Sequence, residues 1–181
     1  MADDSGKTVL EGIVIEDVNA GDNDTKGNQY VWVPIGEIKI NENAETKNIM
    51  LGRYDFENNT AGEIKQTIDN YTSIVTINSY FQELTSSSYG NTVAKNIGDF
   101  LSKANVSGGY YIGRFEAGQI EGKADKFNIK KNQTVYNNIS QKDAANISKN
   151  LYNSTFESDL INSYAYDTAI VFIQTFGGDP N

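Results

Sequence analysis

Chemistry in this chain must come from carboxylates, hydroxyls, lysine and arginine, because its 181 residues include no histidine and no cysteine. The absence of imidazole and thiol groups excludes Ser-His and Cys-His triads, zinc fingers, disulfide scaffolds and covalent thiol mechanisms. Two carboxylates such as Glu116 and Asp167 would suffice for glycoside hydrolysis, but nothing in their spacing brings them together. The sequence therefore identifies no catalytic residue.

The chain holds 13 lysines but only two arginines, Arg53 and Arg114, and both lie in the same short pattern. Residues 51–55 and 112–116 each run aliphatic, Gly, Arg, aromatic, acid. Side chains two apart share one face of a strand, so Arg114 can meet Glu116 there. Three interpretations stay open: a structural arginine, an anchor for a ligand or partner, and coincidence. Under the second, Arg53, Arg114 and Glu116 are candidate binding residues.

Aromatic residues near the second pattern offer another candidate surface. Tyr110, Tyr111 and Trp32 carry ring faces that can stack on sugars, although aromatic residues in apolar strands usually pack into a core. We take Tyr110 and Tyr111 as candidate contacts for a ligand or partner. Trp32 is assigned a structural role, as are Tyr166 and Asp167 in the last helical pattern.

An acidic segment, residues 17–24, contains the oxygen ligands that Ca²⁺ prefers. It departs from the EF-hand pattern, because Gly21 stands at a ligand position and no glutamate occupies the twelfth place. We interpret the segment as a solvated acidic loop and expect neither a metal site nor a cofactor.

The elements that would position these residues are strands in the first part of the chain and one strand further on. Short β-branched or apolar runs predict them, and the run 30–33 is stopped by Pro34, which cannot donate a ladder hydrogen bond. Polar segments 41–48 and 119–133 are predicted as connections. The predicted strands cover 8–15, 30–33, 35–40, 49–54, 73–77 and 110–115.

Helices are predicted mainly in the second half. The stripe that begins at Val93 has apolar residues at i, i+4, i+7, i+8 and i+11, with Asn91 as its N-cap and two glycines after it. Ser140 and Asp143 approximate a capping box for a helix to about residue 153, and Ser158 is predicted to cap a helix ending at Phe176. A weaker helical pattern covers 64–71. In the helix that includes the stripe from Val93 and in the helix after Ser140, the residues predicted to face inward are Ile97, Phe100, Leu101, Ala104, Ala144, Ile147 and Leu151.

Because the strands cluster early and no βαβ alternation appears, the sequence predicts an α+β fold. We expect a short mixed or antiparallel sheet with about three helices, in a single domain spanning 8–178. Residues 1–7 are polar and are predicted to be a disordered N-terminus.

A formal net charge of −9 limits the partners of this chain. Nucleic acids and anionic lipid surfaces are held by clustered Lys and Arg, so we expect no direct nucleic-acid partner and no membrane partner. No run reaches the roughly 18 apolar residues of a membrane helix. An acidic surface does suit a basic protein.

Three segments carry a family resemblance: GNQYVWVP at 27–34, GGYYIGRFEAG at 108–118 and SDLINSYAYDTAIVFIQ at 158–174, with VYNNIS at 135–140 between the last two. In this order they resemble a family of bacterial and phage-associated proteins of Firmicutes. That family is similar to the formylglycine-generating-enzyme (sulfatase-modifying-factor) family, whose fold is related to C-type lectins. The resemblance spans nearly the whole chain.

The departures from that pattern bear on activity. The family usually has Trp-Asp where this chain has Tyr166 and Asp167, and it continues into a Gly-Asn-x-x-Glu-Trp segment and an Arg-Gly-Gly strand, whereas this sequence stops at Asn181. The resemblance thus implies a shortened version of the fold, lacking the C-terminal half. Cysteines that hold copper, and the histidine ligands of iron in related enzymes, have no counterpart here.

The combination predicts a non-catalytic binding module of a bacterial or phage protein, with a protein or glycan partner. The alternative is a small acidic inhibitor encoded by a phage, of the anti-CRISPR type, which occupies the basic nucleic-acid groove of an effector nuclease. A second copy or a complementing chain is a further expected partner. The first function places the protein at a bacterial or phage surface, and the second in the host cytoplasm.

Overall fold

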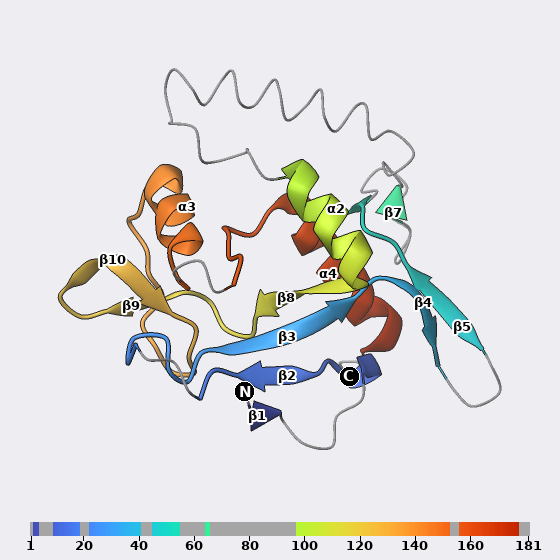
Figure 1. Cartoon of the computed structure of the whole chain (residues 1–181), viewed down its shortest axis with the longest axis horizontal. Coiled ribbons are helices and arrows are strands. Elements are labelled where there is room, and N and C mark those ends of the chain that lie inside the picture. Colours follow the sequence, from blue (N-terminus) through green and yellow to red (C-terminus); the bar gives the residue numbers. More distant parts are fainter. Residues whose placement is uncertain are drawn as a thin grey trace.

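A central four-stranded antiparallel sheet runs through the molecule, and the helices pack beside it (Figure 1). The class is therefore mixed α+β, with three helices and small antiparallel sheets in the part of the chain that is described. For residues 2–3, 53–54, 64–65 and 97–99 only the backbone is described. The computed structural model describes residues 2–3, 9–18, 22–40, 45–54, 64–65, 97–152 and 156–177.

The central sheet has the strand order β1-β2-β3-β8, and every neighbouring pair is antiparallel. Its centre is β3, the predicted strand that ends at Pro34, and its partner β8 confirms the strand predicted from residue 110. The bounds are β1 Ala2–Asp3, β2 Val14–Glu16, β3 Gln29–Pro34 and β8 Gly109–Gly113.

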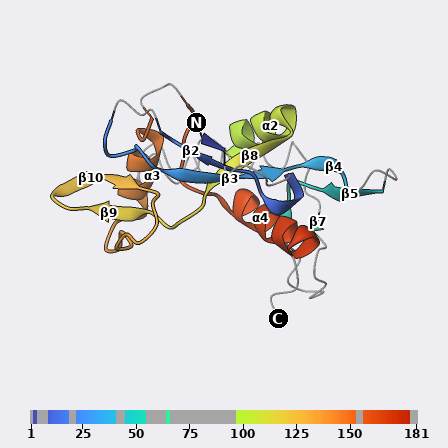
Figure 2. The ribbon, with the colours of Figure 1, turned by 90° about the horizontal axis from the view of Figure 1, so that it is seen from below.

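Side chains alternate between the two faces of this sheet. Val33 is paired with Tyr110 on one face, and Trp32 with Tyr111 on the other. Figure 2 shows the sheet edge-on, with α2 drawn on one side of its strands and α4 on the other. The face of Val33 and Tyr110 packs into the main core, which contains residues of both α2 and α4. Trp32 and Tyr111 therefore lie on the face turned away from that core.

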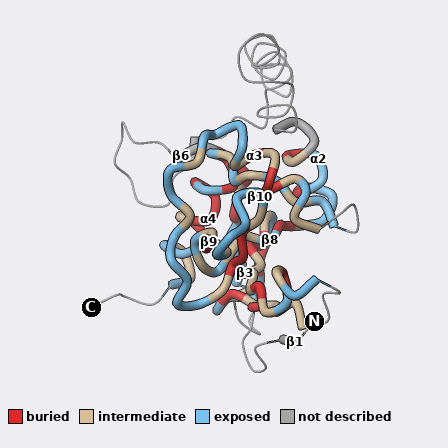
Figure 3. Tube along the Cα trace, turned by 90° about the vertical axis from the view of Figure 1, so that its left-hand side faces the viewer, coloured by how far each residue is buried: buried red, intermediate tan, exposed pale blue. Residues whose placement is uncertain are grey.

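The main core joins the sheet, two helices and the β4–β5 hairpin. Buried stretches run through the interior near β3 and β8, and the exposed stretches lie around them (Figure 3). The cluster confirms the inward stripe of α2, since Leu101 and Ala104 are both buried. Its buried members are Val33, Ile38, Ile49, Leu51, Leu101, Ala104, Tyr110, Tyr164, Ala165, Ala169, Val171 and Phe172.

The three helices lie close to their predicted positions. The predicted cap at Asn91 lies outside the described residues. Ser140 caps α3 as predicted, accepting a hydrogen bond from the backbone N–H of Asp143 at 3.1 Å. The buried residues of α3 include Ala145, whereas Ala144, predicted to face inward, is partly buried. The bounds are α2 Ile97–Ser107, α3 Gln141–Lys149, which ends earlier than predicted, and α4 Ser163–Phe176.

The predicted cap of the last helix was wrong. Asn162, not Ser158, is the N-cap of α4, and its side-chain oxygen accepts from the N–H of Ala165 at 3.0 Å. The hydroxyl of Ser158 donates instead to the carbonyl of Ser148 at 2.6 Å, which ties the connecting segment to α3. Both residue types cap helices well, so composition alone could not choose between them.

A second, smaller cluster lies between α3 and a hairpin that the sequence did not predict. Residues 119–133 were predicted as a polar connection, but they contain most of β9 and all of β10. Phe127, Ile129 and Ile147 form the buried centre of this cluster. The prediction failed because most of the hairpin's side chains are exposed and polar, so that no apolar alternation marks its strands. The bounds are β9 Gly118–Ile120 and β10 Lys123–Asn128.

One prediction near the N-terminus was also wrong. Residues 8–15 do not form one strand: a 3-10 turn at Val9–Glu11 precedes β2, and Gly12 between them has φ of +78°. Within 1–7 only Ala2 and Asp3 are described, where β1 pairs with β2 in the register Ala2↔Glu16, so the predicted disorder of this segment stays a prediction.

The middle of the chain differs in its strand boundaries. The strand predicted at 35–40 is confirmed as β4, but the one predicted at 49–54 is divided, because Leu51 and Gly52 form a buried bend between β5 and β6. The helix predicted at 64–71 was wrong at its first two residues, 64–65, which form strand β7. The strand predicted at 73–77 lies outside the described residues. The bounds are β4 Gly36–Lys39, β5 Thr46–Ile49, β6 Arg53–Tyr54 and β7 Ile64–Lys65.

Within the described ranges, no helix has the length and apolar character needed to span a lipid bilayer.

Candidate functional site

The Trp32–Tyr111 pair is the most exposed aromatic feature of the central sheet. The two ring centroids are 4.8 Å apart with an interplanar angle of 58°. Tyr111 is 50% exposed, whereas Trp32 is partly covered. A Cβ atom on Gly109 would lie 2.4 Å from Cζ2 of Trp32, so the indole rests directly on the backbone of β8. The pair is thus a ring surface fixed to the centre of the fold.

Three further aromatic residues extend this surface. Tyr30 shares the sheet face of Trp32, its ring centroid is 6.1 Å from that of Tyr152, and Tyr152 is 5.9 Å from Phe156. Phe156 is 53% exposed. We call Tyr111, Trp32, Tyr30, Tyr152 and Phe156 the aromatic band. Its two ends, Tyr111 and Phe156, are accessible, and its middle is held by packing.

Buried hydrogen bonds fix the middle of the aromatic band. The hydroxyls of Tyr30 and Tyr152 lie 2.8 Å apart, and the amide nitrogen of Asn28 donates to the Tyr152 hydroxyl at 3.2 Å. Asn28 is fully buried, and its side-chain oxygen accepts from the N–H of Ile129 at 2.8 Å. Burial raises the pKa of both tyrosines, so the two phenols stay neutral and hydrogen-bonded.

Sequence reasoning found only part of this band. Tyr111 and Trp32 were singled out, but Tyr30, Tyr152 and Phe156 were not. Tyr30 could have been found from its i, i+2 relation to Trp32. Tyr152 and Phe156 follow α3, and no local pattern places them against β3.

Tyr110 lies on the sheet face opposite to that of Tyr111, and its side chain is buried in the main core. Its hydroxyl donates to the backbone carbonyl of Ala165, and its ring packs edge-on against Phe100 at 5.2 Å. Burial raises the pKa of Tyr110, with a smaller contribution from the nearby Asp167. Asp167 is itself buried. Tyr110 therefore packs and orients α4, whereas Tyr111 faces outward.

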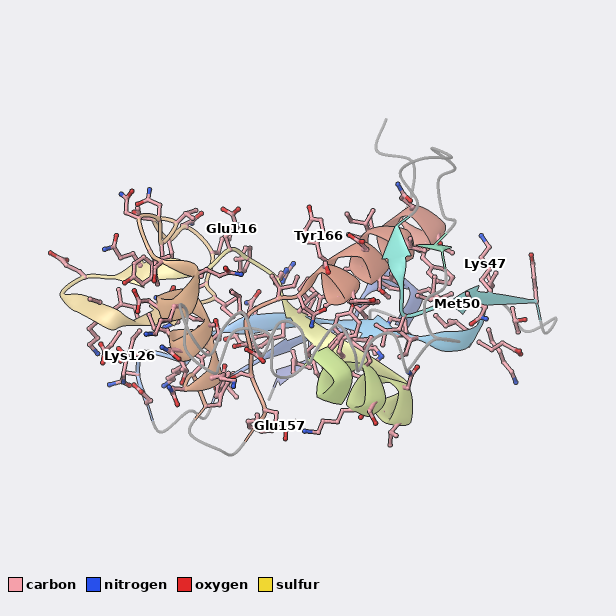
Figure 4. The ribbon with its side chains drawn as sticks, turned by 90° about the horizontal axis from the view of Figure 1, so that it is seen from above. Lys47, Met50, Glu116, Lys126, Glu157 and Tyr166 are labelled. Carbon is pink, nitrogen blue, oxygen red and sulfur yellow. The ribbon has the colours of Figure 1, made fainter. Side chains whose placement is uncertain are left out.

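Tyr166, to which the sequence assigned a structural role, is 56% exposed on the outer side of α4, where Figure 4 shows it directed away from the sheet. It follows the buried Tyr164 and Ala165, and the helical turn carries it to the solvent side. Its structural role stays a prediction.

Arg114 belongs to a polar ladder at the end of the sheet. Its Nη1 donates to Oε1 of Gln29 at 2.9 Å, and Nε2 of Gln29 donates to Oε2 of Glu16 at 2.8 Å. The strand ends at Gly113, so the strand geometry predicted to place Arg114 beside Glu116 is not formed. Glu116 is exposed. The first interpretation of this arginine, a structural one, fits the hydrogen bond to Gln29.

Arg53, the other candidate arginine, lies in β6 opposite Lys65 of β7. Its side chain is outside the described residues, so its predicted binding role stays a prediction.

The acidic loop is an ion-pair site. Lys123 Nζ lies 2.6 Å from a carboxylate oxygen of Asp24, and Lys126 Nζ bridges Asp22 at 2.8 Å and Asp24 at 3.1 Å. The bond from Lys126 lowers the pKa of Asp22, and the bond from Lys123 lowers that of Asp24. Figure 4 shows Lys126 at the hairpin end of the molecule. We call these four side chains the loop clamp, because they join the loop before β3 to β10.

Among the described residues, no group of three or more acidic side chains is arranged to hold a metal ion. What the described surface offers is ring faces at the two ends of the aromatic band. Such rings bind by stacking and by apolar contact, with neutral phenols able to donate a hydrogen bond.

Comparison of the chain with models of known protein families, with curated proteins and with solved structures found no match.

Proposed function

We propose that this protein is a non-catalytic binding module that recognises its partner through the aromatic band. The observation that carries the proposal is the half-exposed ring of Tyr111, which packs at a tilt against Trp32 at the centre of the sheet. Exposed aromatic rings are costly in water and are enriched where proteins bind their partners.

The rigidity of the band supports this proposal. Side chains that are already ordered lose little conformational entropy on binding, and tyrosine has few rotatable bonds. Because Gly109 has no side chain, the Trp32 ring lies directly against the backbone of β8. The side-chain amide of Asn28 donates a hydrogen bond to the Tyr152 hydroxyl. The accessible ends are therefore preorganised. A protein or a glycan can meet such a surface, and the exposed Phe156, which has no polar group, favours a protein.

Tyr111→Ala tests the proposal, because it removes the exposed ring while the core face of β8 stays intact. We expect at least a tenfold loss of affinity for the partner, the loss typical of a central aromatic contact. The matched control is Val106→Ala, which trims an apolar residue that is 87% exposed on α2. Phe156→Ala should weaken binding at the other end of the band.

The measurement is capture from host lysate and binding to a glycan array, each with wild type and the three variants. A partner that wild type and Val106→Ala retain and Tyr111→Ala loses supports the proposal. Equal retention by Tyr111→Ala, or silence of folded wild type in both assays, contradicts it.

We further propose that the scaffold is related to the formylglycine-generating-enzyme and C-type-lectin-like fold. The segments that carry the resemblance support this, since they lie together in one core: 27–34 contains β3, 108–118 contains β8, and 158–174 contains most of α4. The sheet strands among them pair directly, and α4 packs on the same core.

A second candidate function is the acidic inhibitor of a nuclease with a basic groove. The net charge of −9 favours it, as does the engagement of Lys103, Lys123 and Lys126 in ion pairs within the chain. Such a complex weakens as salt rises. Inhibition of a nuclease panel at low and high salt tests it, and a lack of inhibition at low salt excludes it.

A further inference from the structure

The outer side of α4 is apolar although the helix lies on the protein surface. Tyr166 and Ile173 are 56% and 64% exposed, and Ile170 between them is partly buried. The three residues are spaced i, i+4 and i+7, so they form one line along the helix, which we call the α4 stripe. It lies on the other side of the sheet from the aromatic band.

The α4 stripe carries no charge. Asp167 is the only charged residue of this 14-residue helix, and it is buried. In the whole chain, 22% of residues are charged. An uncharged outer face on a strongly acidic protein is therefore a local exception.

Opposite charges stand at the two ends of this neutral face. In the view of Figure 4, Glu116 lies beyond the start of α4 and Lys47 lies beside its end, with Tyr166 between them. Both charged side chains are exposed. The Lys47 ammonium is 6.0 Å from the ring centroid of Phe176, the last residue of the helix.

We propose that the α4 stripe binds a second copy of this chain, with the two α4 helices antiparallel about a two-fold axis. A two-fold axis brings identical patches together, so a charge at the centre would face its own copy and repel it. The neutral stripe avoids this repulsion. The same axis places Glu116 of one copy toward Lys47 of the other, and it sets the helix dipoles in opposite directions.

A second copy fits this face better than a basic protein does. A basic partner gains nothing from an uncharged stripe, whereas two chains of net charge −9 meet with least repulsion where neither carries a carboxylate. A 14-residue helix is about 21 Å long, so the interface is small and the dimer is expected to be weak.

Sedimentation velocity over a roughly 100-fold range of protein concentration measures this association. We expect a reversible monomer–dimer equilibrium for wild type. Ile173→Glu should raise the dissociation constant at least about tenfold, because each copy then brings a carboxylate into the apolar interface. Val106→Glu is the matched control, since it adds the same charge at an exposed site on α2 and should change the dissociation constant far less.

A charge exchange tests the antiparallel arrangement separately. Glu116→Lys alone should weaken the dimer by up to about 25-fold, about fivefold for each of the two exposed ion pairs that the two-fold axis forms, and adding Lys47→Glu should restore it. Circular dichroism confirms that each variant is folded. A wild type that stays monomeric at the highest concentration, or equal effects of Ile173→Glu and Val106→Glu, overturns the interface. Additive weakening by the two charge changes overturns the antiparallel orientation.

Discussion

Gly109 is the residue on which the aromatic band depends most directly. Its φ is +155°, and an added Cβ would lie 2.4 Å from Trp32 Cζ2 and 2.5 Å from the carbonyl oxygen of Val33. Neither the indole nor the strand backbone can move far, because the Trp32 ring also packs on Tyr111. Glycine is therefore required there for close approach as well as for backbone conformation.

Gly109→Ala should destabilise the protein by about 3 kcal/mol or more, since it combines overpacking with backbone strain. Gly122→Ala is the control: its φ is +75°, but an added Cβ would have no atom within 4 Å. The control should cost only about 1–2 kcal/mol, the strain of a left-handed alanine. Urea denaturation measures both changes, and equal costs would show that contact with Trp32 is unimportant.

At the scale of elements, the loop clamp joins the loop before β3 to the β9–β10 hairpin. The clamp holds two segments that are about a hundred residues apart in sequence, as Lys126 and Asp24 are separated by 102 positions. It works by charge alone on an open surface, since three of its four side chains are more than 40% exposed. Its strength should therefore depend on pH and on salt.

The pH dependence of the loop clamp has a definite sign. The pKa values of Asp22 and Asp24 are lower in the folded protein than their ordinary value of 3.8. Their contribution to stability is therefore present above pH 3.8 and is lost as the pH falls through the folded values. Asp22→Asn with Asp24→Asn should lower the urea midpoint at pH 7, and the difference from wild type should vanish in acid.

The control for this pair of changes is Glu121→Gln with Asp125→Asn, which alters the net charge equally on the β9–β10 hairpin, the partner of the loop in the clamp. It should leave the midpoint nearly unchanged at pH 7, because a surface charge without a close partner contributes little. A midpoint difference for the clamp variant that persists unchanged into acid would contradict an ionic clamp.

The elements also show which parts of this fold a sequence can predict. The run at 30–33 before Pro34 and the cap at Ser140 carry local signals, and both were placed correctly. The β9–β10 hairpin carries none, because its exposed polar strands are held by long-range partners such as Asp24. The aromatic band was half predicted for the same reason: Tyr111 and Trp32 belong to marked strands, whereas Tyr152 meets Tyr30 only after the chain has folded.

At the scale of the whole molecule, the aromatic band and α4 lie on opposite faces of one sheet, because α4 packs on the face of Val33 and Tyr110, and Trp32 and Tyr111 belong to the other face. A dimer joined through the α4 stripe would therefore present two aromatic bands facing outward. Two such surfaces can engage neighbouring copies of a partner at once, which raises the overall affinity without any new contact. The proposed dimer and the proposed binding function would then reinforce each other, although each can fail alone.

The net charge decides how such a dimer responds to salt. Two charges of −9 held about 35 Å apart repel by roughly 10 kcal/mol in unscreened water, whereas each Glu116–Lys47 pair contributes at most about 1 kcal/mol. At physiological ionic strength the screening length is about 8 Å, so most of the long-range repulsion disappears while the apolar contact remains. The dimer should therefore strengthen as sodium chloride rises from about 20 mM to 300 mM. Sedimentation velocity at each salt concentration checks this, with Ile173→Glu as the control that should stay monomeric throughout. A dimer that dissociates as salt rises would show that ion pairs, rather than the α4 stripe, hold the two copies together.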